Sequence, residues 1–287
     1  MEYRQIDLAA WRQVGEGGNG KVFVNADYPD VILKINKSGL DTLDFALKEY
    51  SVSTAVGKLG VAVPEAKEIV RVGDSYGTIT ERIVGKKSLS RICCDEPARI
   101  EEMAKFLCAR GKELFATPCD TTLFPSRKAQ LEKCFNQVRF VSRKNLDLIR
   151  AFADTVEDKN TCIHGDLNMG NLVLSGDRYF WIDLDRFGYG DPMFDLGHLF
   201  LICNVYAPMK QVQNIFHMKE DQLRRFWDAF AKAYAGKEDH TELDLLAGKF
   251  AALDMILCYE FHKNRLAEQI FFGIIIKKLI RTYYASA

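Results

Sequence analysis

The first third of the chain contains short apolar runs separated by turn residues, a pattern typical of strands. The runs are Trp11–Val14, Val22–Val24, Val31–Ile35, Val61–Val63, Glu68–Val72 and Gly77–Ile83. Between the third and fourth runs, four apolar residues fall at i, i+3, i+4 and i+7, which is one face of a helix: Leu43, Ala46, Leu47 and Tyr50. We therefore expect a small antiparallel β-sheet with one main helix, which ends at Gly57 to Gly60.

Beyond Gly85 the apolar spacing changes to that of helices. Two sets of residues each share one helix face: Ile100, Met103, Ala104 and Leu107, then Leu131, Cys134, Phe135 and Val138. The chain again has helical spacing from about residue 194 to the end, and Thr161–Ile182 looks like a pair of strands among these helices. The pattern predicts an α+β protein with two lobes, a β-rich one over 1–84 and a mostly α-helical one over 85–287.

Charge and composition narrow the function classes. Lys plus Arg and Asp plus Glu each number 39, so the chain lacks the basic excess of a nucleic-acid or membrane-surface binder. Met1–Gln5 lacks the apolar stretch of a signal peptide, and the apolar run Ile270–Ile276 is too short to span a bilayer. None of the eight cysteines forms a CxxC pair, which favours buried, reduced thiols. We expect a cytoplasmic protein without nucleic-acid or membrane partners, and the sequence leaves its oligomeric state open.

A predicted hairpin carries the first candidate chemistry. Leu172–Leu174 and Tyr179–Ile182 are strand-like, and the turn between them would place Asn171 opposite Asp183. An amide oxygen and a carboxylate are hard ligands of the kind that suits Mg²⁺. Asp166 lies five residues before Asn171, close enough to contact a hydroxyl beside such a metal. The alternative is that all three are ordinary turn residues.

A glycine cluster supplies a second, independent signal. Gly15, Gly17 and Gly20 have the GxGxxG spacing, which alone is weak and occurs also in dinucleotide-binding folds. A strand and not a helix follows the cluster, which argues against the dinucleotide-binding unit. Lys34 lies in the next strand, Val31–Ile35, and Glu49 on the following helix is placed to pair with it.

Together these motifs resemble a known superfamily. His164-x-Asp166-Leu167-x-x-x-Asn171 is similar to the kinase catalytic loop, and residues 163–196 resemble the aminoglycoside phosphotransferase and choline kinase superfamily. The resemblance implies a protein-kinase-like bilobal fold that uses ATP and Mg²⁺. It implies that Gly15, Gly17, Gly20 and Lys34 bind the phosphates and that Glu49 holds Lys34. Backbone groups near Glu81 and Ile83 would bind adenine. Asn171 and Asp183 would bind Mg²⁺, and Asp166 would be the catalytic base.

The sequence favours a small hydroxyl substrate over a protein. Gly165 stands where protein kinases usually have an arginine, and few residues separate Asp183 from Asp195, which leaves little room for an activation loop. An aminoglycoside, an amino alcohol and a sugar all remain open as acceptors. The alternatives are a protein Ser/Thr kinase and a catalytically silent, ATP-binding pseudokinase that acts as a regulatory module.

Several further polar residues receive weaker assignments. By resemblance Asp195 stabilises the catalytic loop, whereas His164 is expected to be structural and Asp185 is either a second metal contact or solvated. Three helical carboxylates could meet a cationic substrate or simply face solvent: Asp244, Asp254 and Glu260. Four histidines show no ligand spacing and receive no role: His198, His217, His240 and His262.

Overall fold

The computed structural model describes all residues except 1, 17–19, 37–41, 263–264 and 285–287. The chain forms two compact units: an N-terminal unit of Met1–Lys87 with Leu172–Asp185, and a C-terminal unit of Ser88–Asn171 with Arg186–Ala287. The expected division at 84/85 thus differs in two ways, since it lies after Lys87 and the hairpin segment joins the N-terminal unit. Backbone hydrogen bonding explains the second difference, because the Trp181 N–H donates to the Ala62 carbonyl (2.8 Å).

The N-terminal unit is built on one six-stranded sheet, with strand order β1-β5-β6-β4-β3-β2 among the described residues. Its elements are β1 (Arg4–Gln5), η1 (Leu8–Ala10), β2 (Arg12–Glu16), β3 (Gly20–Val24), β4 (Val31–Asn36), α1 (Thr42–Lys58), β5 (Ala66–Val72), β6 (Ser75–Glu81), β9 (Leu172–Ser175) and β10 (Arg178–Trp181), with β7 (Lys87–Ser88) at the division. Neighbouring strands are antiparallel except β1, which pairs parallel with β5.

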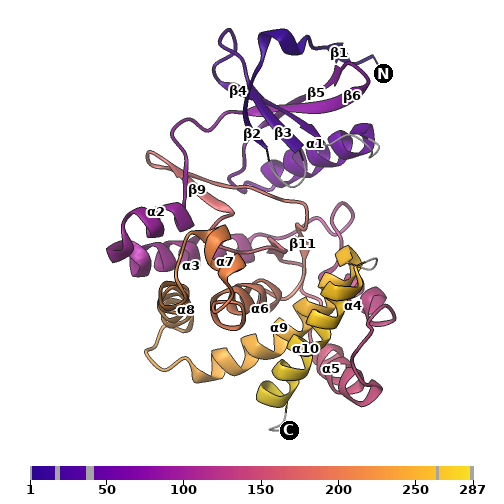
Figure 1. Ribbon diagram of the computed structural model, residues 1–287, viewed down its shortest axis with the longest axis vertical. Helices are drawn as coiled ribbons and strands as arrows, with labels where there is room; N and C mark the ends of the chain where they lie inside the picture. Colours follow the sequence, from indigo (N-terminus) through magenta and orange to yellow (C-terminus); the bar gives the residue numbers. More distant parts are fainter. Residues whose placement is uncertain (1, 17–19, 37–41, 263–264, 285–287) are drawn as a thin grey trace. The chain divides into compact units, whose positions relative to one another are not determined.

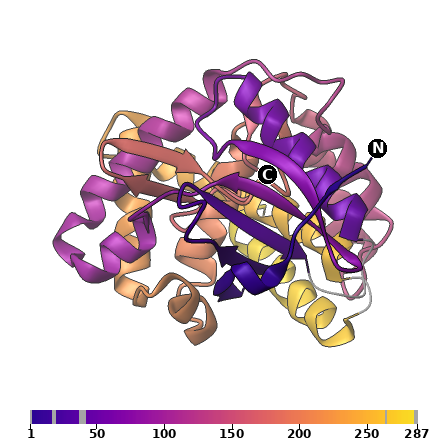
Figure 2. The ribbon, with the colours of Figure 1, turned by 90° about the horizontal axis from the view of Figure 1, so that it is seen from above.

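The sheet has its own apolar core, and α1 packs against β4, β5 and β6 (Figures 1 and 2). The core consists of Ile6, Trp11, Phe23, Leu33, Val70, Val72 and Ile79. Most of these core residues belong to the apolar runs that predicted the strands. One expected strand is absent: Val61–Val63 is an irregular connection between α1 and β5. Within this connection, the Ala62 carbonyl accepts the hydrogen bond from Trp181 at the end of β10.

The C-terminal unit is mostly helical, as expected. Its elements are α2 (Leu89–Asp95), η2 (Pro97–Arg99), α3 (Ile100–Ala116), α4 (Arg127–Phe135), α5 (Arg143–Thr155), β8 (Cys162–Ile163), β11 (Gly188–Tyr189), α6 (Met193–Phe200), the π-helical turn η3 (Leu201–Val205), α7 (Lys210–Phe216), α8 (Glu220–Ala235), α9 (Thr241–His262) and α10 (Leu266–Tyr283). Its eight cysteines form no disulfide. Among the described residues, no helix is long and apolar enough to cross a membrane.

Helices α6 and α9 pack closely at the centre of this unit. Gly197 makes the approach possible, because a Cβ there would lie 2.6 Å from the Phe250 Cβ and 2.7 Å from the Phe250 backbone carbon. Such distances are shorter than any carbon contact that folded proteins accommodate. A glycine on α6 thus brings the side chains that flank it within reach of α9.

A histidine joins the end of α8 to the start of α9. The Nδ1 atom of His240 lies 2.9 Å from Asp244 Oδ1, and its Nε2 atom lies 3.1 Å from Asp228 Oδ1. Trp227 Nε1 donates to the same Asp244 oxygen (2.8 Å), and Lys232 pairs with Asp228. Burial opposes the charge of His240, but hydrogen bonds to the two carboxylates raise its pKa above 6.5. Asp244 is therefore a structural partner of His240.

This junction gives a pH-dependent stability. Because the folded pKa of His240 exceeds the unfolded value, its contribution is fully present below the unfolded pKa and is lost as pH rises through the folded pKa. We expect His240→Gln to lower the free energy of unfolding by about 1–2 kcal/mol near pH 6 and by less near pH 9. Urea unfolding of both proteins across this range measures the difference. An equal loss of unfolding free energy at pH 6 and at pH 9 would contradict a protonated His240 between the two carboxylates.

Candidate active site

The N-terminal unit contains an ion pair that the sequence predicted. Lys34 Nζ on β4 lies 2.6 Å from Glu49 Oε1 on α1. The second oxygen of Glu49 accepts a hydrogen bond from Thr78 Oγ1 (2.8 Å), and Thr78 is the cross-strand neighbour of Lys34 on β6. The carboxylate is thus fixed at both oxygens, and it holds the ammonium group at a defined position on the sheet.

This ion pair lines a cavity of about 490 Å³ within the N-terminal unit. Asp183 and Asp185 line the same cavity. Burial opposes the charge of Lys34, but the carboxylates of Glu49, Asp185 and Asp183 raise its pKa above the ordinary value. Asp183 has φ +62°, a left-handed conformation that non-glycine residues rarely adopt and that is often found at functional sites. The Lys34–Glu49 pair therefore shares one cavity with Asp183 and Asp185, and further charged residues line the same cavity: Lys48, Glu81, Arg82 and Lys86.

The other predicted nucleotide-binding residues lie around this cavity or near it. Gly20, at the start of β3, lines the cavity, and Gly15 in β2 pairs with Val22 beside a register shift, whereas Gly17 lies outside the described residues. Glu81 and Ile83 line the cavity at the end of β6. The Glu81 N–H already donates to the Glu65 carbonyl (2.8 Å). A ligand would therefore meet Glu81 through its carbonyl oxygen.

In the C-terminal unit, the loop after β8 is held by α6. The buried carboxylate of Asp195 accepts hydrogen bonds from the backbone N–H groups of His164 and Gly165, each at 2.7 Å. Burial raises the pKa of Asp195 to about 6, and these two donors oppose the shift. The contact that the resemblance implied for Asp195 is therefore present. His164 is fully buried, as expected of a structural residue.

Gly165 departs from the protein-kinase pattern for a steric reason. Its φ is +77°, and a Cβ there would lie 2.1 Å from the Arg186 carbonyl oxygen. Its own carbonyl accepts a hydrogen bond from Arg127 Nη2 (2.8 Å). No arginine can occupy this position without moving the backbone of residue 186.

Asp166 is held by three side chains of the C-terminal unit. Its Oδ1 lies 2.7 Å from His198 Nε2, and its Oδ2 accepts a hydrogen bond from Asn171 Nδ2 (3.1 Å). Asn168 and Asn171 also donate to its backbone carbonyl, at 3.0 and 2.9 Å. Burial opposes ionisation, but the hydrogen bond and charge of His198 lower the pKa of Asp166 below its ordinary value. The carboxylate is ionised and fixed in orientation.

The predicted hairpin exists, but its register differs by one residue from the expectation. Ser175 pairs with Arg178 across a two-residue turn, and the ladder ends at Leu172 opposite Trp181. The predicted direct opposition of Asn171 and Asp183 is therefore wrong. It required Leu172 to pair with residue 182, whereas Leu172 pairs with Trp181. Neither residue belongs to the ladder: Asn171 directly precedes Leu172, and Asp183 follows Trp181 by two positions.

The residues present fit a magnesium ion by their donor chemistry. Asn171 commits its Nδ2 atom to Asp166, which leaves Oδ1 as the amide atom that can bind a metal. Asp183 offers carboxylate oxygens from the cavity beside Lys34. Among the described residues, no group of three or more His, Cys, Asp or Glu side chains could hold a metal by itself. A sparse oxygen set of this kind suits Mg²⁺, which keeps waters and phosphate oxygens as its remaining ligands.

Comparison with known proteins identifies the family. The model of the phosphotransferase enzyme family matches residues 10–246, which is most of the chain. The chain belongs to the phosphotransferase enzyme family. It is a phosphotransferase, as the sequence predicted. No curated protein sequence matches it.

Solved structures confirm the protein-kinase-like fold of this phosphotransferase. A thermostable mutant of aminoglycoside phosphotransferase APH(4)-Ia, in ternary complex with ADP and hygromycin B, is 14% identical with a TM-score of 0.61, covering 95% of this chain and 93% of that one. The GDP complex of an aminoglycoside 2'-phosphotransferase-IIIa mutant is 17% identical with a TM-score of 0.58 (98% and 94% covered). A choline/ethanolamine kinase family protein from Mesorhizobium loti is 16% identical with a TM-score of 0.55 (96% and 87% covered).

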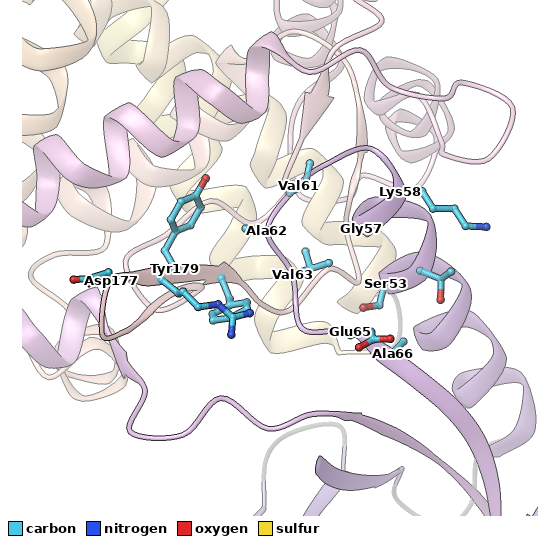
Figure 3. Close-up of a pocket in the computed structure, with 13 residues that line it drawn as sticks. Ser53, Gly57, Lys58, Val61, Ala62, Val63, Glu65, Ala66, Asp177 and Tyr179 are labelled. Atoms are coloured by element: carbon cyan, nitrogen blue, oxygen red, sulfur yellow. The ribbon is translucent and has the colours of Figure 1, made fainter. Parts of the chain in front are cut away.

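The phosphotransferase has a second, larger cavity in its N-terminal unit, of about 680 Å³. Figure 3 shows that α1 contributes Ser53 and Lys58, the following connection contributes Val61 and Val63, and β10 contributes Tyr179. None of the ion-pair or carboxylate residues of the first cavity lines it, and the two share only Ser53. We therefore take the smaller cavity, and not the larger one, as the N-terminal part of the candidate active site.

Sequence reasoning missed several residues of this phosphotransferase's site. His198 was given no role, and Asp254 was expected to face substrate or solvent, yet they hydrogen-bond each other in the interior (His198 Nδ1 to Asp254 Oδ2, 2.8 Å). Thr78 and Arg127 were not considered. The partners of these residues lie 29 to 56 positions away in sequence, so no local spacing could reveal them.

The buried Asp195 contact predicts a large effect on stability. Asp195→Asn keeps the shape but has only one acceptor oxygen, so one of the two loop N–H groups loses its partner. We expect the free energy of unfolding to fall by about 2–3 kcal/mol. Urea denaturation measures it, with Asp221→Asn on the exposed first turn of α8 as control, which should cost less than about 0.5 kcal/mol. Equal effects of the two substitutions would contradict the proposed support of the loop.

Proposed function

We propose that this protein is an ATP-dependent small-molecule kinase that transfers the γ-phosphate of ATP to a hydroxyl of a small substrate. The observation that carries the proposal is the cavity of the N-terminal unit, which brings together the Lys34–Glu49 ion pair and the Asp183 carboxylate. An ammonium fixed beside carboxylates is the arrangement that binding of a metal–nucleotide complex requires. The volume of this cavity, about 490 Å³, lies within the range of small-molecule sites.

In this proposal the N-terminal unit binds the nucleotide. Lys34, held by Glu49, contacts the α- and β-phosphates, since an ammonium with a fixed position acts as a preorganised counter-charge. Backbone N–H groups of the segment with Gly15, Gly17 and Gly20 cover the phosphates. Adenine hydrogen-bonds backbone groups near Glu81 and Ile83, with the Glu81 carbonyl as acceptor because its N–H is engaged.

Two residues would hold Mg²⁺: Asp183 through its carboxylate and Asn171 through Oδ1. The ion, when bound, neutralises charge on the phosphate oxygens. Asp185 lines the same cavity as Asp183 and is the further carboxylate that could approach it. The hydrogen bonds from Asn171 to Asp166 tie the metal-binding amide to the catalytic loop.

Asp166 is the proposed catalytic base. It orients the acceptor hydroxyl, whose oxygen forms a bond to the γ-phosphorus as the bond from phosphorus to the bridging oxygen breaks. The electron pair of the broken bond leaves with ADP, and the acceptor proton passes to Asp166. Because the pKa of Asp166 is low, this proton is transferred late, which suits the loose transition state of phosphoryl transfer.

A small acceptor is favoured over a protein. Residues 184–192 alone separate Asp183 from α6, and Gly165 excludes an arginine at its position. The similar structures include complexes with hygromycin B, kanamycin and gentamicin and a choline/ethanolamine kinase family protein. We therefore propose an aminoglycoside, an amino alcohol or a sugar as the acceptor class. Retention of Lys34, Asp166 and Asp183 argues against a silent pseudokinase.

Nucleotide binding tests the first half of this proposal. Titration calorimetry with Mg·ATP should show binding to the wild type and to Asp166→Ala, because Asp166 is not one of the proposed phosphate-binding groups. Lys34→Ala and Asp183→Asn should each weaken binding by about 10- to 100-fold, the effect of losing one charged interaction. Thr54→Ala, at the second cavity, is the control and should bind normally. Wild-type affinity of both weakened variants would contradict the site.

Turnover tests the second half. We expect one class from a panel of aminoglycosides, amino alcohols and sugars to stimulate ADP formation by the wild type in the presence of Mg²⁺. Asp166→Ala should abolish that stimulation while retaining Mg·ATP binding, since it removes only the group that orients the hydroxyl. A coupled ADP assay and ³¹P NMR of the product measure it. Stimulation that persists in Asp166→Ala would remove this residue from its proposed role.

A further inference from the structure

His198 lies between two carboxylates of the C-terminal unit, and its side chain is 12% exposed. Its Nε2 atom is 2.7 Å from Asp166 Oδ1, and its Nδ1 atom is 2.8 Å from Asp254 Oδ2. A carboxylate oxygen can only accept, so each ring nitrogen must carry a proton to make these contacts favourable. The ring is therefore an imidazolium cation with a charge-assisted hydrogen bond on each side.

The surrounding packing fixes this ring. His198 follows Gly197, at which α6 approaches the backbone of α9, and Asp254 on α9 is only 1% exposed. Arg127 Nη2 lies 3.9 Å from the other Asp254 oxygen. A buried carboxylate with cationic partners on both sides cannot swing away without leaving charges unpaired. Asp254 is thus a rigid support for the distal side of the ring.

The charges of the neighbouring elements favour the same protonation state. Burial opposes the charge of His198, but Asp254 and Asp166 raise its pKa to about 10. Arg186 and Arg127 supply the remaining cationic charge near Asp254, and the charge of Arg186 also acts on Asp166. His198 thus stays protonated throughout the neutral range and neither gives nor takes a proton during turnover.

We propose that His198 is a positioning residue for phosphoryl transfer, which holds Oδ1 of Asp166 so that Oδ2 accepts the hydrogen bond of the acceptor hydroxyl. This inference rests on the proposed kinase function. Without the ring, the carboxylate of Asp166 loses its shortest side-chain hydrogen bond and keeps only the longer ones from Asn171 (3.1 Å) and Asn168 (3.4 Å), so its orientation is less well defined. Asp254 acts one step further away, by holding the ring that holds the base.

The alternative is a purely structural bridge between α6 and α9, and two amide substitutions separate the two roles. In His198→Gln the side-chain amide nitrogen lies near the position of Nε2, so it can still donate to Asp166. In His198→Asn it lies near the position of Nδ1, so it can still donate to Asp254, but Asp166 loses the hydrogen bond from residue 198. Each variant loses one hydrogen bond and the cationic charge, which makes them a matched pair.

The kinetic test uses Mg·ATP with the acceptor found in the panel. We expect His198→Asn to lower kcat by about 10- to 100-fold, because a small misplacement of a catalytic group has an effect of this size. His198→Gln should retain several-fold more activity than His198→Asn, and KM for ATP should change little in both. His240→Gln, which alters a histidine between two carboxylates that do not contact Asp166, is the control and should leave kcat unchanged. If His198→Asn were as active as His198→Gln, the positioning role would be rejected.

A spectroscopic test separates this inference from the proposed function. The ¹⁵N shifts of the ring, assigned by comparison with His198→Gln, should show both nitrogens protonated near neutral pH in the wild type. A neutral ring in an enzyme that transfers phosphate would reject the role of His198 alone. A doubly protonated ring in a protein that transfers phosphate to no acceptor would reject the proposed function and the kinetic role with it.

Discussion

The candidate active site depends first on the buried carboxylate of Asp195. Two backbone N–H groups of the loop after β8 donate to it, so the loop takes its path from α6 and not from its own sequence. A buried carboxylate without such donors would be strongly destabilising, and the same donors in the interior would be costly if left unpaired. The interaction is therefore reciprocal, and it fixes residues 164 and 165, the two residues that directly precede the proposed base.

The same helix orients the base itself. Gly197 lets α6 approach α9, and the next residue, His198, reaches both Asp166 and Asp254. Three residues within one four-residue stretch of α6 therefore support the site. Asp195 holds the loop, Gly197 allows the close approach to α9, and His198 contacts the carboxylate of Asp166. In the N-terminal unit, Glu49 plays a similar part, because its two oxygens are fixed by Lys34 and Thr78. In both units a carboxylate is positioned by partners that come from different elements.

Local patterns predicted what is encoded locally. The strands of the sheet, α1 with its end at Lys58, and the helical character of the C-terminal unit follow from apolar spacing, and the Lys34–Glu49 pair follows from the resemblance to kinases. The errors concern properties that packing decides. The hairpin register shifted by one residue because a two-residue turn closes it, and Val61–Val63 forms no strand although it is apolar. His198 and Asp254 look like ordinary helical residues until α6 and α9 meet.

The most direct test of the account is a crystal structure of the protein with Mg²⁺ and a non-hydrolysable ATP analogue. The account predicts the nucleotide in the cavity of the N-terminal unit, with Lys34 on the α- and β-phosphates while still paired with Glu49. It also predicts Mg²⁺ bound by Asp183 and by Oδ1 of Asn171. A nucleotide bound elsewhere, or a metal held without Asp183, would contradict the central claim.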